Sequence, residues 1–433
     1  MAKVLLATLG SLGDLHPFIA VARALKQQGC DPAIATIPDY RDRVVAAGIR
    51  FCATGPSSEQ RLADLRMGRE QFARHILADS DFIFRHAVYP YLRSSYDEVI
   101  EAVAEAELVL TSSLSFAAQL AAEKLERPRM AIVLQPTLFL SAYDPPLIGE
   151  FGWLAPLLPR LGPKAAGAVL SGVKRVLARR AAPIRMLRRE LRLPDLRQDP
   201  IFDGQFTREG AIALYSRLLA DVQPDYPSPT TLAGFAFYDG DAAGAADCDE
   251  GLRQFLNAGP PPIVFTLGSF ATEAAGDFFE VSVRSARTLK CRAVVLVGEG
   301  TADEHWGSQI MVRRYAPYSA LFPFAQAIVH HGGIGTTAQA LRAGKPQLIV
   351  PIFADQLDNA ARAARLGVAR VLRRSRYSDK RLITALNALL GDHGVAERAG
   401  VVSAQINQED GASCAARAVL ARLWRGASAA ASA

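Results

Sequence analysis

Short apolar runs that end in turns and lead into helical patterns recur along the chain. Residues 3–9 form the first run, and residues 17–28 follow with helical periodicity, a Pro at the start and Gly29 just past the end. Further runs lie at residues 32–37, 108–112 and 129–134. Strands that alternate with helices in this way predict βαβ units, and therefore an α/β fold with a parallel sheet covered on both faces.

A second series of the same kind begins after the Pro-rich stretch 221–234. Its apolar runs lie at residues 261–269, 292–298, 327–333 and 346–353. A chain of 433 residues exceeds one ordinary core, so two α/β domains are expected. The predicted boundaries are domains at 1–222 and 241–405, a linker at 223–240, a C-terminal helix at 406–425 that packs back, and a disordered tail at 426–433.

Composition excludes several classes of protein. No run approaches the ~18 apolar residues of a membrane span, and the N-terminal run is too short for a signal peptide. Five scattered cysteines without a CxxC pair favour neither a zinc site nor a disulfide framework. The net charge of +6 suits anionic ligands or lipid surfaces better than nucleic acid. We therefore expect a cytoplasmic protein that binds no nucleic acid.

The middle of the chain, residues 147–193, interrupts the strand–helix alternation. From Lys174 to Arg192 it holds eight Lys or Arg residues against one Glu. The plainer interpretation is a solvated helix face over ordinary core. The alternative is a basic amphipathic surface, within 171–193, that meets anionic lipid at the inner face of the membrane or an amphiphilic acceptor.

The most informative stretch is residues 327–360. A strand ends at His330 and His331, a glycine-rich turn follows, and a helix opens at Thr336. Glycine lets backbone N–H groups approach an anion, and a helix N-terminus favours negative charge, so a diphosphate fits there. The spacing matches neither a Walker loop nor GxGxxG. A glycine-rich turn beside a buried histidine is the structural alternative.

A second strand in this stretch ends at Asp355 and Gln356, and Asn359 follows one turn into the next helix. A carboxylate and a carboxamide at the tip of a strand suit the hydroxyl groups of a sugar. In a doubly wound sheet that tip faces the ligand crevice.

These residues resemble the nucleotide-sugar signature of family 1 glycosyltransferases, which have the GT-B fold of two facing Rossmann-like domains with a cleft between them. His331, Gly333 and Thr336 match its first part, and Asp355-Gln356 its second. The resemblance implies an N-terminal acceptor domain and a C-terminal donor domain, without a cofactor or a bound metal. The donor-binding residues it implies are Ser269, Tyr315, Ala316, His331, Gly333, Gly335, Thr336, Thr337, Asp355 and Gln356.

Within that family, the segments TIPDYRDRV, GFAFYDG, YAPYSALFP and HHGGIGTT are similar to bacterial rhamnosyltransferases of rhamnolipid synthesis. This similarity implies transfer of rhamnose from dTDP-rhamnose to a hydroxyl of a lipid, with a UDP-sugar and a natural-product acceptor as alternatives. Gln339 stands where many UDP-sugar enzymes carry a Glu that binds both ribose hydroxyls. Gln339 at this position is compatible with a nucleotide-sugar donor that contains deoxyribose, such as a thymidine nucleotide.

The turn GSLGDLHP, residues 10–17, carries an acid directly before a helical pattern. Asp14 is well placed to cap that helix. The family resemblance implies that Asp14 is the general base toward the acceptor hydroxyl, with His16 as the alternative. It also implies that His331, the N–H groups near Thr336 and Ser269 stabilise the leaving diphosphate, and that the anomeric centre inverts.

Two other functions fit the same fold. A nucleotide-sugar 2-epimerase shares the two-domain architecture but needs no acceptor pocket. The segment 147–193 favours an acceptor pocket and therefore speaks against an epimerase. The other is an inactive protein that only binds a nucleotide sugar or that acts as a partner of an active transferase. The intact set of Asp14, His331 and Asp355-Gln356 speaks against it.

Overall fold

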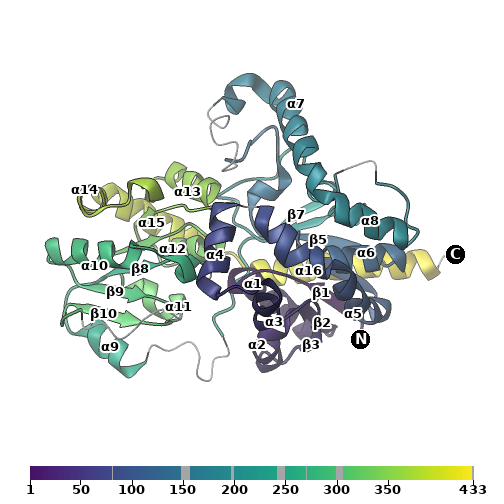
Figure 1. The fold of residues 1–433 in the computed structure, drawn as a ribbon, viewed down its shortest axis with the longest axis horizontal. Helices are drawn as coiled ribbons and strands as arrows, with labels where there is room; N and C mark the ends of the chain where they lie inside the picture. The colour runs from purple at the N-terminus through teal and green to yellow at the C-terminus, as the bar shows by residue number, and fades with distance from the viewer. Residues whose placement is uncertain are drawn as a thin grey trace.

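The computed structural model describes residues 1–79, 81–147, 157–196, 199–240, 249–269, 271–298 and 306–431, with the backbone alone at 159 and 426–431. Two lobes, each built on a parallel sheet, lie side by side (Figure 1). The first contains the N-terminus and the last helix, and the second contains the glycine-rich turn of residues 331–335.

The first sheet has the order β3-β2-β1-β4-β5-β6-β7, and all of its paired strands are parallel. Its strands are β1 Lys3–Ala7, β2 Asp31–Thr36, β3 Arg50–Ala53, β4 Leu108–Thr111, β5 Arg129–Val133, β6 Ala211–Ala213 and β7 Thr230–Leu232. Its α-helices are α1 Leu12–Gln27, α2 Arg41–Ala46, α3 Ser58–Leu65, α4 Arg69–Ala78, α5 Leu92–Glu105, α6 Phe116–Lys124, α7 Leu158–Ala178 and α8 Ala182–Glu190.

The second sheet has the order β10-β9-β8-β11-β12-β13 and is parallel throughout. Its strands are β8 Ile263–Thr266, β9 Ala293–Leu296, β10 Ile310–Arg313, β11 Ala327–His330, β12 Gln347–Ile349 and β13 Ala369–Val371. The helices that follow residue 240 are α9 Glu250–Asn257, α10 Phe278–Thr288, α11 Tyr318–Leu321, α12 Ile334–Arg342, α13 Gln356–Arg365, α14 Asp379–Leu390, α15 His393–Ile406 and α16 Gly411–Ala431.

Both sheets reverse their strand order at one point, between β1 and β4 in the first and between β8 and β11 in the second. Ligands of doubly wound sheets bind beside the carboxyl ends of the strands at such a switch point. The predicted α/β fold of two Rossmann-like domains is therefore confirmed, and each domain presents one such edge.

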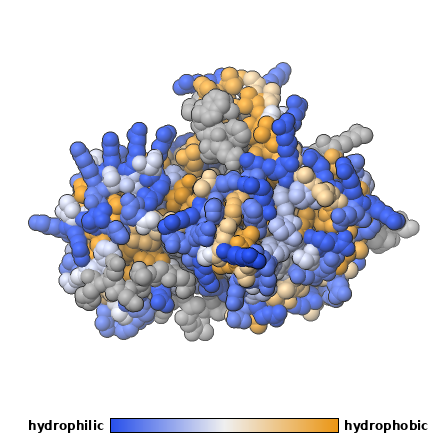
Figure 2. Space-filling model, in the orientation of Figure 1, coloured by the Kyte–Doolittle hydropathy of each residue, from blue (hydrophilic) through white to orange (hydrophobic). Residues whose placement is uncertain are grey.

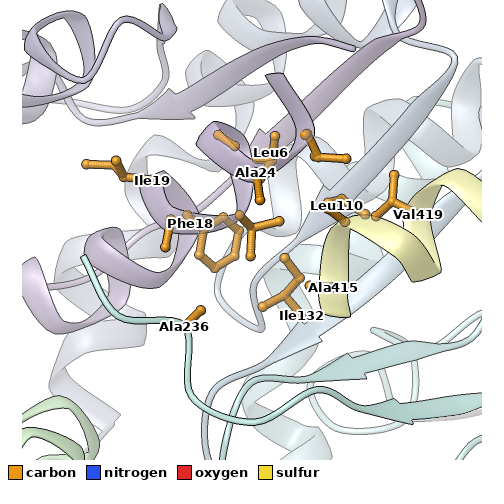
Figure 3. Close-up of a cluster of buried hydrophobic side chains, with 14 of the residues drawn as sticks. Leu6, Phe18, Ile19, Ala24, Leu110, Ile132, Ala236, Ala415 and Val419 are labelled. Atoms are coloured by element: carbon orange, nitrogen blue, oxygen red, sulfur yellow. The ribbon is translucent and has the colours of Figure 1, made fainter. Parts of the chain in front are cut away.

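The first domain closes its core with the last helix of the chain. In Figure 3, Leu6 of β1, Phe18 of α1 and Leu110 of β4 lie in one cluster with Ala415 and Val419 of α16. Burying a large apolar side chain such as Phe18 contributes about 1.5–3 kcal/mol. Helix α16 is thus part of the N-terminal core.

A further apolar cluster joins the two domains. It contains Val133 and Tyr215 from the first domain and Ile349 and Ala360 from the second. Helix α4 also contacts the segment Ala271–Ala274 that follows β8. These contacts hold the switch-point edges of the two domains toward each other.

Four details differ from the sequence-based expectations. Helix α1 begins at Leu12, five residues before Pro17, because Ser11 and Asp14 cap it. Strand β7 lies inside the segment predicted to be a linker, so the first sheet continues to Leu232. Helix α16 extends through residues predicted to be a disordered tail. The segment 147–193 contains α7, bent at Gly162, and all of α8, while residues 148–156 fall outside the described part.

Candidate functional site

Asp14 sits in the first turn of α1 and closes a capping box with Ser11. The Ser11 N–H and Oγ donate to Asp14 Oδ2 at 2.7 and 3.1 Å, and Gly13 N donates to Ser11 Oγ at 3.2 Å. A Cβ on Gly10 would lie 2.3 Å from Asp14 Oδ2, so the turn admits this carboxylate only because residue 10 is glycine. Burial raises the pKa of Asp14 above its usual value, and Ser11 opposes the rise. A carboxylate with a raised pKa is a better base.

The glycine-rich turns of the two domains meet at this point. A Cβ on Gly335 would lie 3.6 Å from Gly13 Cα, which is van der Waals contact across the domain interface. The charge of Asp14 is also one of the causes that raise the pKa of Asp355. The structure therefore brings Asp14 together with both parts of the predicted donor signature.

His330 and His331 have different surroundings. Gly332 N donates to His330 Nδ1 at 3.1 Å, so the ring proton lies on Nε2, which donates to Gln347 Oε1 at 3.0 Å. His331 is buried as well, but its Nδ1 has no hydrogen-bond partner. Both ring nitrogens of His330 are therefore hydrogen-bonded within the protein, whereas His331 keeps one ring nitrogen that a ligand can bind.

Two glycines enclose the His331 ring. A Cβ on Gly333 would lie 2.5 Å from His331 Nε2, and one on Gly268 would lie 2.6 Å from His331 Cε1. Gly268 also has φ +73°, a left-handed conformation that favours glycine. Burial, followed by the neighbouring His330, lowers the pKa of His331 to about 3. The ring is neutral at pH 7 and acts as a hydrogen-bonding group rather than as a cation.

Helix α12 begins after Gly333 without a side-chain cap, so the N–H groups of its first turn are available to an anion. Thr336 is buried, and its side chain bonds Tyr318, whose hydroxyl also meets Thr266 Oγ1 at 2.9 Å. The Thr337 hydroxyl is buried without a partner. Thr336 can thus offer a ligand its backbone N–H group, whereas Thr337 N donates within the helix to Gly333 O at 2.9 Å.

Asp355 and Gln356 stand at the start of α13. Asn359 Nδ2 donates to Asp355 Oδ2 at 2.6 Å and to Gly332 O at 3.0 Å, which ties α13 to the glycine-rich turn. Burial raises the pKa of Asp355 to about 7, the bond from Asn359 opposes that rise, and the charge of Asp14 adds to it. Gln356 Oε1 accepts from Ile352 N at 2.9 Å, which leaves its amide N–H groups as donors.

The remaining predicted donor residues lie along the same edge of the second sheet. Tyr315 follows β10 with 59% of the residue exposed, so its ring is open to a ligand. Ala316 is buried against Phe322, so only its backbone can face a nucleotide. Ser269, directly after Gly268, is exposed.

His16 points to a different neighbour from Asp14. Its ring packs edge-on against Tyr238 at 5.5 Å, and its Nε2 is buried without a partner. Burial, with Arg43 adding, lowers the pKa of His16 to about 4. Residues two apart on a helix do not share a face, so His16 and Asp14 have different neighbours.

Some polar groups at the domain interface were not predicted. Gln339 Nε2 donates to Asp239 Oδ1 at 3.1 Å, and Arg342 Nη1 donates to Asp239 Oδ2 at 2.6 Å. Two residues of α13 also form hydrogen bonds to the first domain: Asp358 accepts from Thr137, and Arg362 donates to Asp144. Their partners lie about a hundred or more residues away, and no local motif marks them.

Two family models match the chain, one in each domain. The N-terminal domain of glycosyltransferase family 28 matches residues 4–139. The C-terminal domain of proteins like erythromycin biosynthesis protein CIII matches residues 295–423, which include the turn at 331–335 and α13.

Characterised proteins match along most of their length. The chain is 27% identical to the O-mycaminosyltylonolide 6-deoxyallosyltransferase of Streptomyces fradiae, over 94% of each chain. It is 28% identical to the vancomycin aglycone glucosyltransferase of Amycolatopsis orientalis, over 84% of each. The crystal structure of glycosyltransferase VinC in complex with DTDP covers 98% of this chain and 100% of its own, with a TM-score of 0.62 and 19% identity. The last comparison supports the GT-B fold.

Two further features bear on the predictions. Among the described residues, no three His, Cys, Asp or Glu side chains gather as a metal site would require, and metal-independent chemistry stays a prediction. The helices in the described ranges are each too short or too polar to cross a membrane.

Proposed function

We propose that this chain, a glycosyltransferase with the GT-B fold, transfers rhamnose from dTDP-rhamnose to a hydroxyl group of an apolar small molecule, with inversion at the anomeric carbon. The observation that carries the proposal is the contact of the turn that holds Asp14 with the turn of residues 331–337, at Gly13 and Gly335, together with the electrostatic effect of Asp14 on the pKa of Asp355. An acceptor base and a donor-binding edge thus face each other across the two domains.

The proposed reaction has one step. The acceptor oxygen attacks the anomeric carbon while its proton passes to the Asp14 carboxylate, and the bond from that carbon to the diphosphate oxygen breaks with its electron pair. Negative charge grows on the diphosphate, where His331 and the first-turn N–H groups of α12 supply hydrogen bonds. Asp355 and Gln356 hold the sugar hydroxyls.

Three observations support a thymidine nucleotide and a deoxy sugar. The Streptomyces fradiae relative transfers a 6-deoxy sugar by its name, and rhamnose is a 6-deoxy sugar. VinC was solved with DTDP. Gln339, in place of a ribose-binding Glu, has one acceptor oxygen instead of two, and its amide nitrogen donates to Asp239.

The acceptor proposed is a macrocyclic or polycyclic natural product. By their names, the two relatives act on O-mycaminosyltylonolide and on the vancomycin aglycone. Neither is an enzyme of rhamnolipid synthesis, and the comparisons lend no support to the epimerase alternative. A lipid acceptor remains the second candidate because of the basic surface described below.

Nucleotide binding tests the donor assignment. In calorimetric titrations we expect dTDP to bind at least about tenfold more tightly than UDP, and NAD to give no heat of binding. The substitution His331→Ala should weaken dTDP by about tenfold, since one charge-assisted hydrogen bond contributes about 1.5–3 kcal/mol. Tighter binding of UDP would contradict the thymidine donor, and silence with every nucleotide would favour the inactive partner.

The surface of α7 and α8 supports a peripheral contact with anionic membranes. Three basic side chains of this segment are held by acids of their own domain: Lys174 by Asp203, Arg180 by Asp81 and Arg188 by Glu123. Others face solvent beside exposed apolar residues, namely Lys164, Arg175, Arg179, Arg189 and Arg192 beside Leu161, Val176 and Met186. Figure 2 shows hydrophobic and hydrophilic residues side by side on the projection that α7 forms at the top of the view.

A vesicle assay tests this contact. The double substitution Arg175→Glu with Arg179→Glu should weaken binding to phosphatidylglycerol vesicles by at least about tenfold, because each basic residue near such a surface contributes about 1 kcal/mol. Lys380→Glu with Arg381→Glu, on exposed positions of α14, changes the net charge equally and should leave binding unchanged. Equal losses in both variants, or no binding by the unmodified chain, would contradict a membrane-binding face.

A further inference from the structure

Helix α13 carries a buried ion cluster beyond the residues assigned to the donor. Only 2% of the Arg362 side chain and 3% of the Asp358 side chain are exposed, and Arg362 Nε donates to Asp358 Oδ2 at 2.6 Å. Arg362 Nη1 also donates to Asp144 Oδ2 and, at 3.2 Å, to the Leu219 carbonyl oxygen of the first domain. Burial opposes the charge on Arg362, but Asp358 and Asp144 raise its pKa above the usual value, so the cluster is ionic.

Asp358 makes a second connection to the first domain. It accepts from Thr137 Oγ1 at 3.0 Å through Oδ2 and from Leu147 N at 3.0 Å through Oδ1. With Asp144, these contacts attach the 137–147 loop to α13 at three points. The loop leads along the chain to α7, in the segment 147–193 that the sequence associates with the acceptor.

The 137–147 loop is also anchored within its own domain. Ser141 Oγ donates to Asp225 Oδ1 at 2.6 Å, and Ala142 N donates to Asp225 Oδ2 at 2.7 Å. The loop is therefore held from both sides, by an acid of the first domain and by α13 of the second.

The geometry of α13 links this cluster to the sugar. Asp355, Asp358, Asn359 and Arg362 follow the spacing i, i+3, i+4 and i+7, so they lie along one face of the helix. A helix rises about 1.5 Å per residue, so Arg362 stands about 10 Å along the axis from Asp355. One rigid helix thus carries the proposed sugar-binding carboxylate at its start and the attachment of the 137–147 loop two turns later.

We propose that Asp358 and Arg362 are positioning residues that fix the 137–147 loop on α13 and thereby align the acceptor with the sugar held by Asp355 and Gln356. The proposal rests on the function proposed above. Neither residue touches the reacting atoms. Their effect falls on the alignment of two substrates, where an error of about 1 Å can cost about a hundredfold in rate.

Asp144→Ala tests the proposal, because it removes one of the three attachments of the loop to α13 while Arg362 keeps Asp358 as its partner. Arg365→Gln is the matched control: Arg365 Nη1 meets the same Asp144 at 3.4 Å, but its side chain is 59% exposed. The probes are dTDP in calorimetry, and dTDP-rhamnose with 4-methylumbelliferone, a phenol that loses its fluorescence on glycosylation. We expect Asp144→Ala to raise the KM for the phenol and to lower kcat, so that kcat/KM falls at least tenfold with dTDP affinity within twofold, and Arg365→Gln to change none of these.

A second variant and a second measurement make the outcome decisive. Thr137→Val keeps the shape of the side chain, removes one bond to Asp358, and should raise the same KM by a smaller factor. Amide exchange in residues 137–147 should be at least tenfold faster in Asp144→Ala, with residues 331–342 unchanged. Parallel losses of dTDP affinity and phenol affinity, or unchanged exchange in the loop, would overturn the proposal. Absence of transfer by the unmodified chain would instead count against the proposed function, and the exchange measurement would still decide whether Asp144 holds the loop.

Discussion

Asp14→Asn should lower the turnover number for sugar transfer by about 10²- to 10⁴-fold, the range that a general base contributes. Asparagine keeps an oxygen that can accept the Ser11 N–H, so α1 retains most of its cap. What it removes is the carboxylate that takes the acceptor proton. Binding of dTDP, measured by calorimetry, should stay within about twofold of the unmodified chain.

Ser11→Ala separates capping from catalysis. It removes the Ser11 hydroxyl that bonds Asp14 and Gly13 and leaves the carboxylate in place. We expect a loss of about 1 kcal/mol in the free energy of unfolding, with a turnover number within a few-fold of the starting value. If Asp14→Asn retained full transfer activity, or if Ser11→Ala lost as much activity as Asp14→Asn, the base role of Asp14 would be wrong.

Local sequence patterns predicted the strands that build the donor edge. The runs at 327–333 and 346–353 became β11 and β12 because an apolar run bounded by glycine or proline has few alternatives to a buried strand. The start of α1 was misplaced because Pro17 resembles a first-turn proline. The capping pair of Ser11 and Asp14 was the stronger signal, and it sets the first turn.

Contacts between distant residues were beyond local patterns. Asp358 and Thr137 are 221 positions apart, and Gln339 and Asp239 are 100 apart, so their pairing depends on how the two domains pack. The sequence matched His331 to the donor signature but left open how His330 and His331 divide their roles. Only the bonds from Gly332 and to Gln347 show that His330 is satisfied within the fold.

The chain should lose stability steeply as the pH falls from about 6.5 toward 4. Burial lowers the pKa of His16 and His330 to about 4 and that of His331 to about 3, while the unfolded value is about 6.5. Between these values the unfolded chain binds up to three protons that the folded chain does not. Stability supplied by the neutral rings is present above about pH 6.5 and is lost below it, by about 1.4 kcal/mol per pH unit for each histidine.

Asp355 changes the pH dependence of stability in the direction opposite to the histidines. Substitutions at Asp355 and at a histidine should therefore have opposite effects. Its pKa of about 7 means that the folded chain holds a proton between about pH 4 and 7 that the unfolded chain lacks, so this group alone makes stability fall as the pH rises. In urea unfolding followed from pH 7 to 5, Asp355→Asn should therefore steepen the loss of stability toward acid. His16→Phe keeps a ring against Tyr238 and should flatten it by about 1.4 kcal/mol per pH unit, because one titrating group is removed. If both variants kept the slope of the unmodified chain, neither group would change its proton affinity on folding, and the acid sensitivity would arise elsewhere in the chain.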